Sequence, residues 1–235
     1  MVRRTFHCRT DLDVIEHDNS GQEFGGYQAA LDRVKGSFPD RVIVMNDTAV
    51  KHGMLTRAYV SAFLRQVSLD IECFALGSID WDRRSLQLRG LRSPRWIRTH
   101  FFALDQRALR ILDNRLYHPD LDQLVIASSP KDKFFSDEVG QSLQEHIQRY
   151  LFSPSPQSWY AAAPLSESNF PTMVRKARAI LQEKYLSMML ESADASLWPV
   201  YLDRKDRVRA YGEKWIATLR LLVDRLRDSL RSKDR

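Results

Sequence analysis

Three polar residues end an apolar run in the first quarter of the chain, at Asn46, Asp47 and Thr48. The run itself, Val42 to Met45, is short and rich in β-branched residues, which indicates a buried strand. In an open α/β sheet, side chains at the carboxyl end of a strand face the crevice where ligands bind. They could hold a sugar hydroxyl, or a diphosphate through a shared divalent cation. The alternative is that Asp47 or Thr48 caps the next segment.

Segments before this motif predict a strand and a helix. A short strand is expected at Val14 to Glu16, and the turn-forming residues 18–21 follow it. Four apolar residues then recur at helical spacing: Phe24, Tyr27, Leu31 and Val34. A strand, a helix and a second strand in this order indicate a βαβ unit. The expected fold is therefore an α/β sheet flanked by helices.

A second set of elements follows the motif. Residues 55–67 predict a helix, and residues 71–77 and 96–106 predict two further strands. The segment between these strands, Ser78 to Arg95, is polar and basic and predicts a long loop. Five arginines lie in it: Arg83, Arg84, Arg89, Arg92 and Arg95. They would either bind a diphosphate or an anionic lipid-linked acceptor, or be solvated.

The last third of the chain reads as helical, with expected helices over residues 171–190 and 214–230. Prolines in residues 153–158 indicate a linker, so we divide the chain into an α/β domain, 1–152, and a helical C-terminal extension, 153–235. The final helix carries one apolar stripe: Trp215, Ile216, Leu219, Leu222, Val223, Leu226 and Leu230. Its basic polar face suits a membrane surface, but packing on the domain or on a second copy is favoured.

Composition narrows the classes of protein. The chain has 235 residues, of which 43% are hydrophobic and 28% are charged, as expected for a globular protein with a sizeable core. Two cysteines without metal-ligand spacing and no secretory signal favour a cytoplasmic protein. Of the net charge of +6, residues 203–235 supply most, with 11 Lys/Arg against 6 Asp/Glu. Basic and aromatic residues are not interleaved, so no nucleic-acid partner is expected.

The sequence "DNSGQEFGGYQAALDRV" followed by "VIVMNDT" resembles family-two-type glycosyltransferases with the GT-A fold. The likeness is closest to the rhamnan-synthesis and capsular-polysaccharide branch. In that pattern an Asn-x-Gly turn leads a helix, and the next strand ends in a metal-binding motif of DxD type. Later stretches, "ALGSID", "WIRTHFFALDQRAL" and "FFSDEVGQSLQEHI", resemble the same branch in the same order. The resemblance covers roughly Val14 to Phe152 and implies a GT-A-like, Rossmann-related mixed sheet.

The resemblance also implies a function. The protein would transfer a sugar from a nucleotide-sugar donor to a glycan or lipid-linked acceptor in bacterial surface-polysaccharide synthesis. It would act in the cytoplasm, with peripheral attachment at the inner membrane face and a homo-oligomer as further expectations. Two departures from the family pattern support an alternative, in which the protein is a non-catalytic relative that binds glycan or a partner transferase. The N-terminal nucleotide-binding unit is expected to be incomplete, and the motif has one carboxylate instead of two.

Site residues follow from the same likeness. The donor would be bound by Asn19, Gly21, Gly25, Asn46, Asp47 and Thr48, with Asp47 holding Mg²⁺ or Mn²⁺. Asp137 or Glu138, at an expected helix start, would be the general base, although a helix dipole favours acidic residues there in any case. His100 would face the acceptor, and the alternative is a structural histidine.

Overall fold

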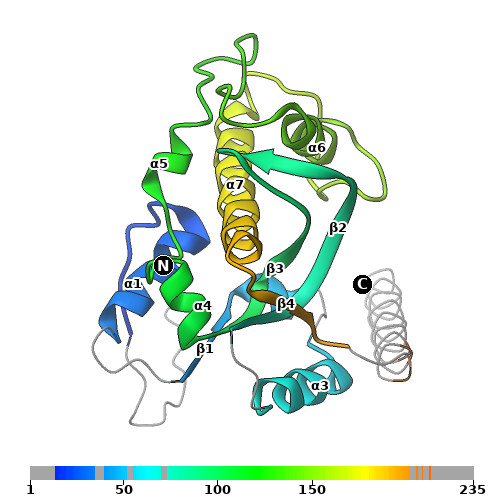
Figure 1. Cartoon of the computed structure of the whole chain (residues 1–235). Coiled ribbons are helices and arrows are strands. Elements are labelled where there is room, and N and C mark those ends of the chain that lie inside the picture. Colours follow the sequence, from blue (N-terminus) through cyan, green and yellow to red (C-terminus); the bar gives the residue numbers. More distant parts are fainter. Residues whose placement is uncertain are drawn as a thin grey trace, which may run out of the picture.

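The computed structural model describes residues 14–34, 40–51, 55–69 and 73–201, together with residues 205, 208 and 212. This part of the chain is an α/β fold with an open, mixed, four-stranded sheet and flanking helices (Figure 1). The strands are β1 (Arg41–Met45), β2 (Phe74–Leu88), β3 (Leu91–Asp105) and β4 (Ser196–Pro199), in the spatial order β1-β3-β2-β4. Because β3 is antiparallel to β1 and β2, and β4 is parallel to β2, only β3 runs against the other three.

Helices cover both faces of the sheet. They are α1 (Gln22–Arg33), α2 (Asp47–Lys51), α3 (Arg57–Val67), α4 (Gln106–Ile111), α5 (Pro119–Asp122), α6 (Gln141–Phe152) and α7 (Phe170–Ser192). On one face α3 packs Tyr59 and Phe63 against Phe101 of β3. On the other face α1, α4 and α7 enclose Phe102 and Leu104. The helices expected over residues 55–67 and 171–190 are confirmed as α3 and α7.

The expected loop over residues 78–95 is wrong, because most of it forms a long hairpin of β2 and β3. Arg89 and Gly90 make its turn, with φ of 50° and 79°. Positive φ at both central residues is the requirement of a two-residue hairpin turn, and Leu88 pairs directly with Leu91 across it. The hairpin was missed because Asp80 and Asp82 are partly buried while Trp81 between them is exposed, the reverse of the alternation that predicts a strand.

The hydrophobic core crosses the boundary that the sequence predicts at residue 152. The hairpin, α6 and α7 share one cluster, which includes Leu86, Trp96, Ile147 and Leu181. The fourth strand, β4, also lies beyond that boundary and pairs with β2, so the second segment is not wholly helical. The division into 1–152 and 153–235 stays a prediction, but segments from both sides of it pack together.

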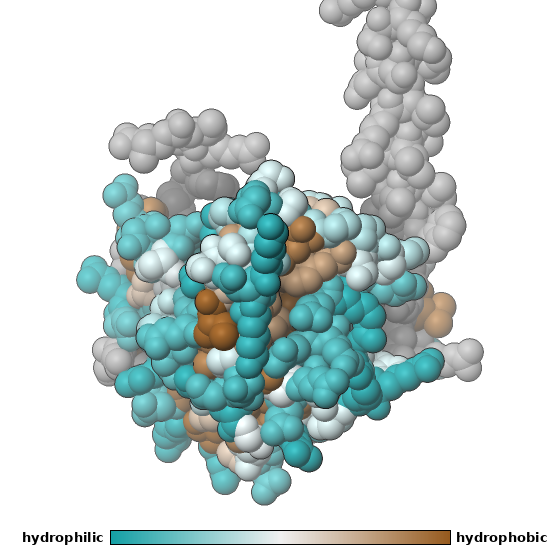
Figure 2. All heavy atoms as spheres, turned by 90° about the horizontal axis from the view of Figure 1, so that it is seen from above, coloured by the Kyte–Doolittle hydropathy of each residue, from teal (hydrophilic) through white to brown (hydrophobic). Residues whose placement is uncertain are grey.

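Two expected elements, over residues 14–16 and 214–230, are not part of the described helices and strands. Val14 to Glu16 forms no strand and is exposed, and no described strand pairs with it. The βαβ unit is therefore not formed, and β1 instead pairs antiparallel with β3. The apolar stripe of residues 214–230 lies outside the described residues. Among those described, no helix is long and apolar enough to cross a membrane. The end of the molecule that carries α6 and the hairpin turn is mostly hydrophilic, with small separate hydrophobic areas (Figure 2).

Candidate functional site

The polar motif after β1 begins a short helix. The Asn46 side-chain oxygen accepts a hydrogen bond from the Thr48 amide at 3.0 Å, which makes Asn46 the cap of α2. The Asn46 amide in turn donates to the carbonyl oxygen of His100 at 3.0 Å. Asp47 stands exposed in the first turn of α2. Capping, the alternative expected for Asp47 or Thr48, is thus performed by Asn46, and the Asp47 carboxylate remains at the surface.

Tyr27 connects α1 to this edge of the sheet. Its hydroxyl donates to the carbonyl oxygen of Thr99, next to His100, at 2.9 Å. Burial raises the pKa of the Tyr27 hydroxyl, and the negative charges of Glu23, Glu183 and Asp47 raise it further. The tyrosine is therefore a neutral donor at physiological pH. It stands among carboxylates that come from α1, α2 and α7.

Glu183 is the most firmly held of these carboxylates. One of its oxygens accepts from both the amide and the hydroxyl of Thr99 at 3.1 Å, and the other accepts from Lys184 at 3.1 Å. Burial alone would raise the pKa of Glu183, but the Lys184 charge and the Thr99 amide hold it below its usual value. The carboxylate therefore stays ionised and fixes the middle of β3 against α7.

Lys184 is a buried cation, with 3% of its surface exposed. Its ammonium lies 3.3 Å from the centre of the Trp96 ring, a cation–π contact. Burial lowers the pKa of Lys184 to about 8, against the opposing influence of Glu183. The pair links α7 to the inner side of the hairpin.

Further charged side chains lie along the hairpin toward α6. The Arg98 guanidinium bonds the Asp80 carboxylate at 2.6 Å. Farther along, Asp82 accepts from His146 at 2.9 Å and from Arg149 at 3.0 Å. Burial lowers the pKa of His146, and the nearby Lys184 charge adds to that effect, so the ring is neutral at pH 7. The strands β2 and β3 and the helix α6 are therefore joined by partly buried polar contacts of Asp80 and Asp82.

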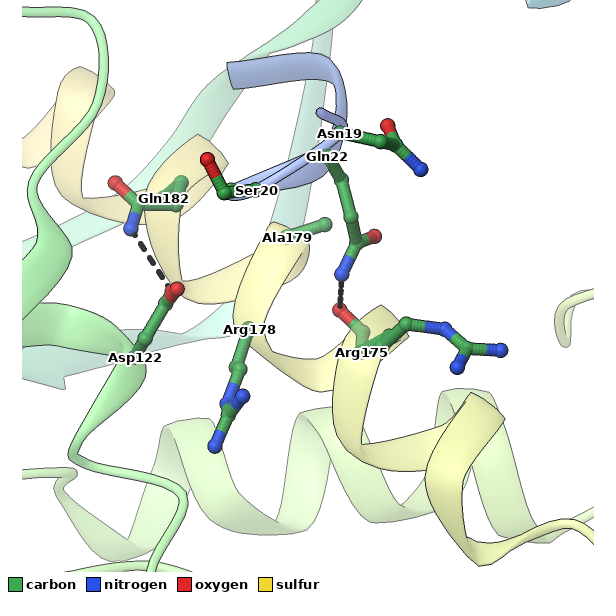
Figure 3. Close-up of a pocket in the computed structure, with 9 residues that line it drawn as sticks. Asn19, Ser20, Gln22, Asp122, Arg175, Arg178, Ala179 and Gln182 are labelled. Carbon is green, nitrogen blue, oxygen red and sulfur yellow. Dashed lines mark hydrogen bonds between the residues drawn. The ribbon is translucent and has the colours of Figure 1, made fainter. Parts of the chain in front are cut away.

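A small cavity lies where α1 begins beside α7 (Figure 3). Its volume is about 200 Å³, below the ~300 Å³ at which pockets for drug-sized ligands begin, so it can hold a single small group. Nine residues line it: Asn19, Ser20, Gly21, Gln22, Asp122, Arg175, Arg178, Ala179 and Gln182. Gln22 donates to the Arg175 carbonyl oxygen at 2.6 Å, and Gln182 donates to Asp122 at 3.2 Å. The guanidinium groups of Arg175 and Arg178 extend in different directions (Figure 3).

Gly21 and Gly25, at the start of α1, are each required by close packing, but against different atoms. Gly21 has φ of 67°, and a Cβ there would lie 2.6 Å from the Tyr117 ring. A Cβ at Gly25 would lie 1.8 Å from the Ser20 carbonyl oxygen. Both positions therefore need glycine for packing. Of the expected donor residues on this turn, Asn19 and Gly21 line the cavity, while Gly25 is buried in the helix.

Asp137 and Glu138 lie at the other end of the hairpin. The helix expected to start with them begins at Gln141, after a Gly140 cap, so their placement at a helix start is wrong. Asp137 is 93% exposed and pairs with Lys133 at 2.5 Å, while Glu138 pairs with Arg89 at 3.0 Å. Arg89 lies in the hairpin turn, roughly 30 Å along β3 from the end of β1.

The predicted site residues thus fall into three places. Asn46, Asp47, Thr48 and His100 meet at the edge of the sheet, and Asn19 and Gly21 meet at the cavity, but the expected bases join neither group. Sequence reasoning missed Tyr27, Thr99, Glu183 and Lys184 as members of the edge. One signal was present, since Lys184 continues the helical spacing of the buried residues Ala177 and Ile180.

Of the carboxylates near this edge, Asp47 is exposed, whereas Glu183 is held by Thr99 and Lys184. Among the described residues, no three His, Cys, Asp or Glu side chains are grouped to hold an ion. Mg²⁺ is commonly bound by one or two carboxylates together with substrate phosphates. Asp47 therefore fits a cation that arrives with a diphosphate. Such a cation would neutralise charge on the diphosphate. Comparison with known proteins adds no assignment, since no family model, curated protein or solved structure matches the chain.

Proposed function

We propose that the chain is a GT-A-like glycosyltransferase that uses a nucleotide-sugar donor and a glycan or lipid-linked acceptor in bacterial surface-polysaccharide synthesis. One observation carries the proposal. The exposed Asp47 follows the carboxyl end of β1 in an open mixed sheet, which is where α/β folds bind ligands. The order of motifs in the sequence supports the same assignment.

The described residues suggest a division of roles. Asp47 would hold the donor diphosphate through a shared cation, while Asn46 keeps the turn rigid by capping α2. Tyr27 would supply a neutral hydroxyl beside the donor, since its raised pKa keeps it protonated. Glu183 would act through Thr99, by fixing the part of β3 where the carbonyl oxygen of His100 accepts from the Asn46 amide. Asp137 and Glu138 remain candidates for the base, but nothing in their surroundings favours that role.

A second candidate function is favoured by the surroundings of the expected bases. Glu138 is tied to Arg89, and Asp137 to Lys133, at a distance from Asp47 that no single sugar would span. A non-catalytic relative, which binds glycan or a partner transferase, needs no base. The two candidates agree on binding at the sheet edge and differ in turnover.

A binding and turnover assay separates them. The melting temperature of the full chain is measured against nucleoside diphosphates and nucleotide sugars, with and without Mn²⁺, and release of nucleoside diphosphate is followed. A glycosyltransferase should show Mn²⁺-dependent stabilisation and slow donor hydrolysis, both lost in Asp47→Asn. The control is Asp113→Asn, which alters another exposed carboxylate, on the turn after α4. Binding without hydrolysis would favour the non-catalytic relative, and no stabilisation by any nucleotide would contradict the glycosyltransferase.

Peripheral membrane attachment through residues 203–235 belongs to the same proposal. It is supported by the excess of basic residues in that segment. Sedimentation with vesicles of anionic phospholipid should carry the full chain down and leave a chain ending at residue 202 in solution. Equal sedimentation of both chains would contradict the attachment.

A further inference from the structure

No described strand pairs with the outer edge of β1. The Asn46 amide bonds His100 of β3, and the Asp40 carbonyl oxygen bonds Gln106, directly after β3, so the backbone groups of Val42 and Val44 between them also face β3. In an antiparallel ladder the alternate residues face the other way. The amides and carbonyls of Arg41, Ile43 and Met45 therefore point outward, where no described strand pairs with them.

The side chains at this edge are apolar and exposed. Ile43 is 47% exposed and Met45 is 52% exposed, and both lie on the face that α3 covers farther along the sheet. Edge strands of monomeric proteins are usually protected by proline, lysine or a bulge. The opposite edge strand, β4, is four residues long and ends with Pro199, whereas β1 has none of these devices. Arg41 is turned away, toward the Leu69 carbonyl and the Phe74 ring.

We propose that β1 pairs with β1 of a second copy, antiparallel and centred on Ile43, so that two sheets join across a two-fold axis. The symmetry requires a self-complementary strand. In this register Ile43 faces Ile43 of the other copy, Arg41 faces Met45, and Asp40 faces Asn46. Three outward-facing positions on each strand would form about six backbone hydrogen bonds.

The charges select this register over its neighbours. Centring on Ile43 is the register in which all three outward-facing residues of each strand, Arg41, Ile43 and Met45, form hydrogen-bonded pairs. Centring on Arg41 would oppose two guanidinium groups, and like charges directly opposite each other are destabilising. Centring on Met45 would place Ile43 opposite Asp47, which already belongs to α2. The Ile43-centred register opposes no like charges.

The pairing is short, so the dimer should depend on concentration. A stable interface buries about 1,200–2,000 Å² in total, and one pair of five-residue strands contributes a fraction of that. We therefore expect monomer and dimer in exchange at micromolar concentrations, with the fraction of dimer rising on concentration. The inference does not depend on the proposed enzymatic function.

Light scattering and sedimentation of the full chain over a range of concentrations test the pairing. Ile43→Lys should weaken the dimer at least tenfold, because it places two ammonium groups opposite each other. Ile126→Lys is the matched control, since Ile126 is 49% exposed and lies next to Phe134, away from β1. A monomer at every concentration, or a dimer that Ile43→Lys leaves intact, would overturn the proposal.

Disulfide trapping gives an independent reading if Ile43→Lys lowers stability. In a chain with Cys8→Ser and Cys73→Ser, Ile43→Cys should form a covalent dimer on mild oxidation. The paired Cα atoms would lie about 5.5 Å apart, within the range of a disulfide. Ile126→Cys should remain monomeric under the same conditions. Equal cross-linking of both variants, or none of Ile43→Cys, would contradict the pairing.

Discussion

Ion pairs contact the β2–β3 hairpin in different surroundings. Midway along it, Glu183 and Lys184 of α7 are enclosed by Thr99 and the Trp96 ring. At the turn end, Arg89 holds Glu138 and Asp120, whose side chains are 55% and 54% exposed. Because solvent screens exposed charges, the turn-end pairs contribute little to stability, whereas breaking the buried pair leaves an uncompensated charge. The burial of an ion pair beside the hairpin therefore decides how much its loss costs in stability.

The largest effect should come from removing one member of the buried pair. Glu183→Gln leaves the Lys184 ammonium buried without its partner, which should lower the free energy of unfolding by about 3–5 kcal/mol. Urea denaturation followed by circular dichroism measures the loss. The double variant Glu183→Gln with Lys184→Met should recover much of it. A loss below about 1 kcal/mol would show that the pair behaves like the exposed ones.

The same pair should make stability depend on pH in the alkaline range. The pKa of Lys184 is about 8 in the folded chain, below the usual lysine value of 10.5. Between these values the unfolded chain binds the proton and the folded chain does not, so stability rises with pH there. We expect the wild-type free energy of unfolding, relative to Lys184→Met, to rise by up to about 3 kcal/mol from pH 8 to 10.5. A flat difference would contradict the lowered pKa.

Two glycines of α1 offer a matched pair of intermediate size. Gly21→Ala should destabilise by about 1–2 kcal/mol, because its φ of 67° disfavours a side chain and the new methyl group would meet Tyr117. Gly26→Ala should stabilise by about 0.5–1 kcal/mol, since it lies inside the helix with open space around it. Thermal denaturation of both variants checks the opposite signs. Equal effects would mean that the turn at the cavity is not constrained as described.

The smallest effect is expected at the turn end of the hairpin. Glu138→Gln should change the free energy of unfolding by less than about 1 kcal/mol, because Glu138 is more than half exposed. The wild type should lose the same small difference when salt is raised to about 1 M, where screening acts within about 3 Å. Chemical denaturation at two salt concentrations measures it. A loss comparable to that of Glu183→Gln would mean that the exposed pair and the buried pair contribute equally to stability.

The sequence predicted elements whose residues repeat with a clear period. The helix α3 was found from apolar spacing, α7 from the helical character of the last third of the chain, and β3 in large part from its apolar run. The outer part of the hairpin was not found, because Asp80 and Asp82 of β2 contact Arg98 and His146 where the pattern requires apolar residues. Its turn at Arg89 and Gly90 was hidden as well, since arginine is not a residue that usually signals positive φ.

The candidate site was predicted in part for a similar reason. A strand that ends on polar residues is visible in the sequence, so Asp47 and its neighbours were found. The other residues of the site bond one another and come from distant segments: Tyr27 from α1, Thr99 from β3 and Glu183 from α7. No local pattern links positions so far apart, and only tertiary packing brings them together. The helix start expected at Asp137 failed because Gly140, four residues from Ser136, provides the cap.

The parallel pairing of β4 with β2 has a consequence for how the chain folds. Ser196 to Pro199 pair with Phe74 to Gly77, across more than a hundred residues of intervening chain. During synthesis the edge of β2 therefore remains unpaired until nearly the last described residues have been made. Exposed strand edges recruit other chains, so this interval favours aggregation. Chains that stop before residue 196 should accumulate in inclusion bodies, while chains that include β4 should be recovered folded.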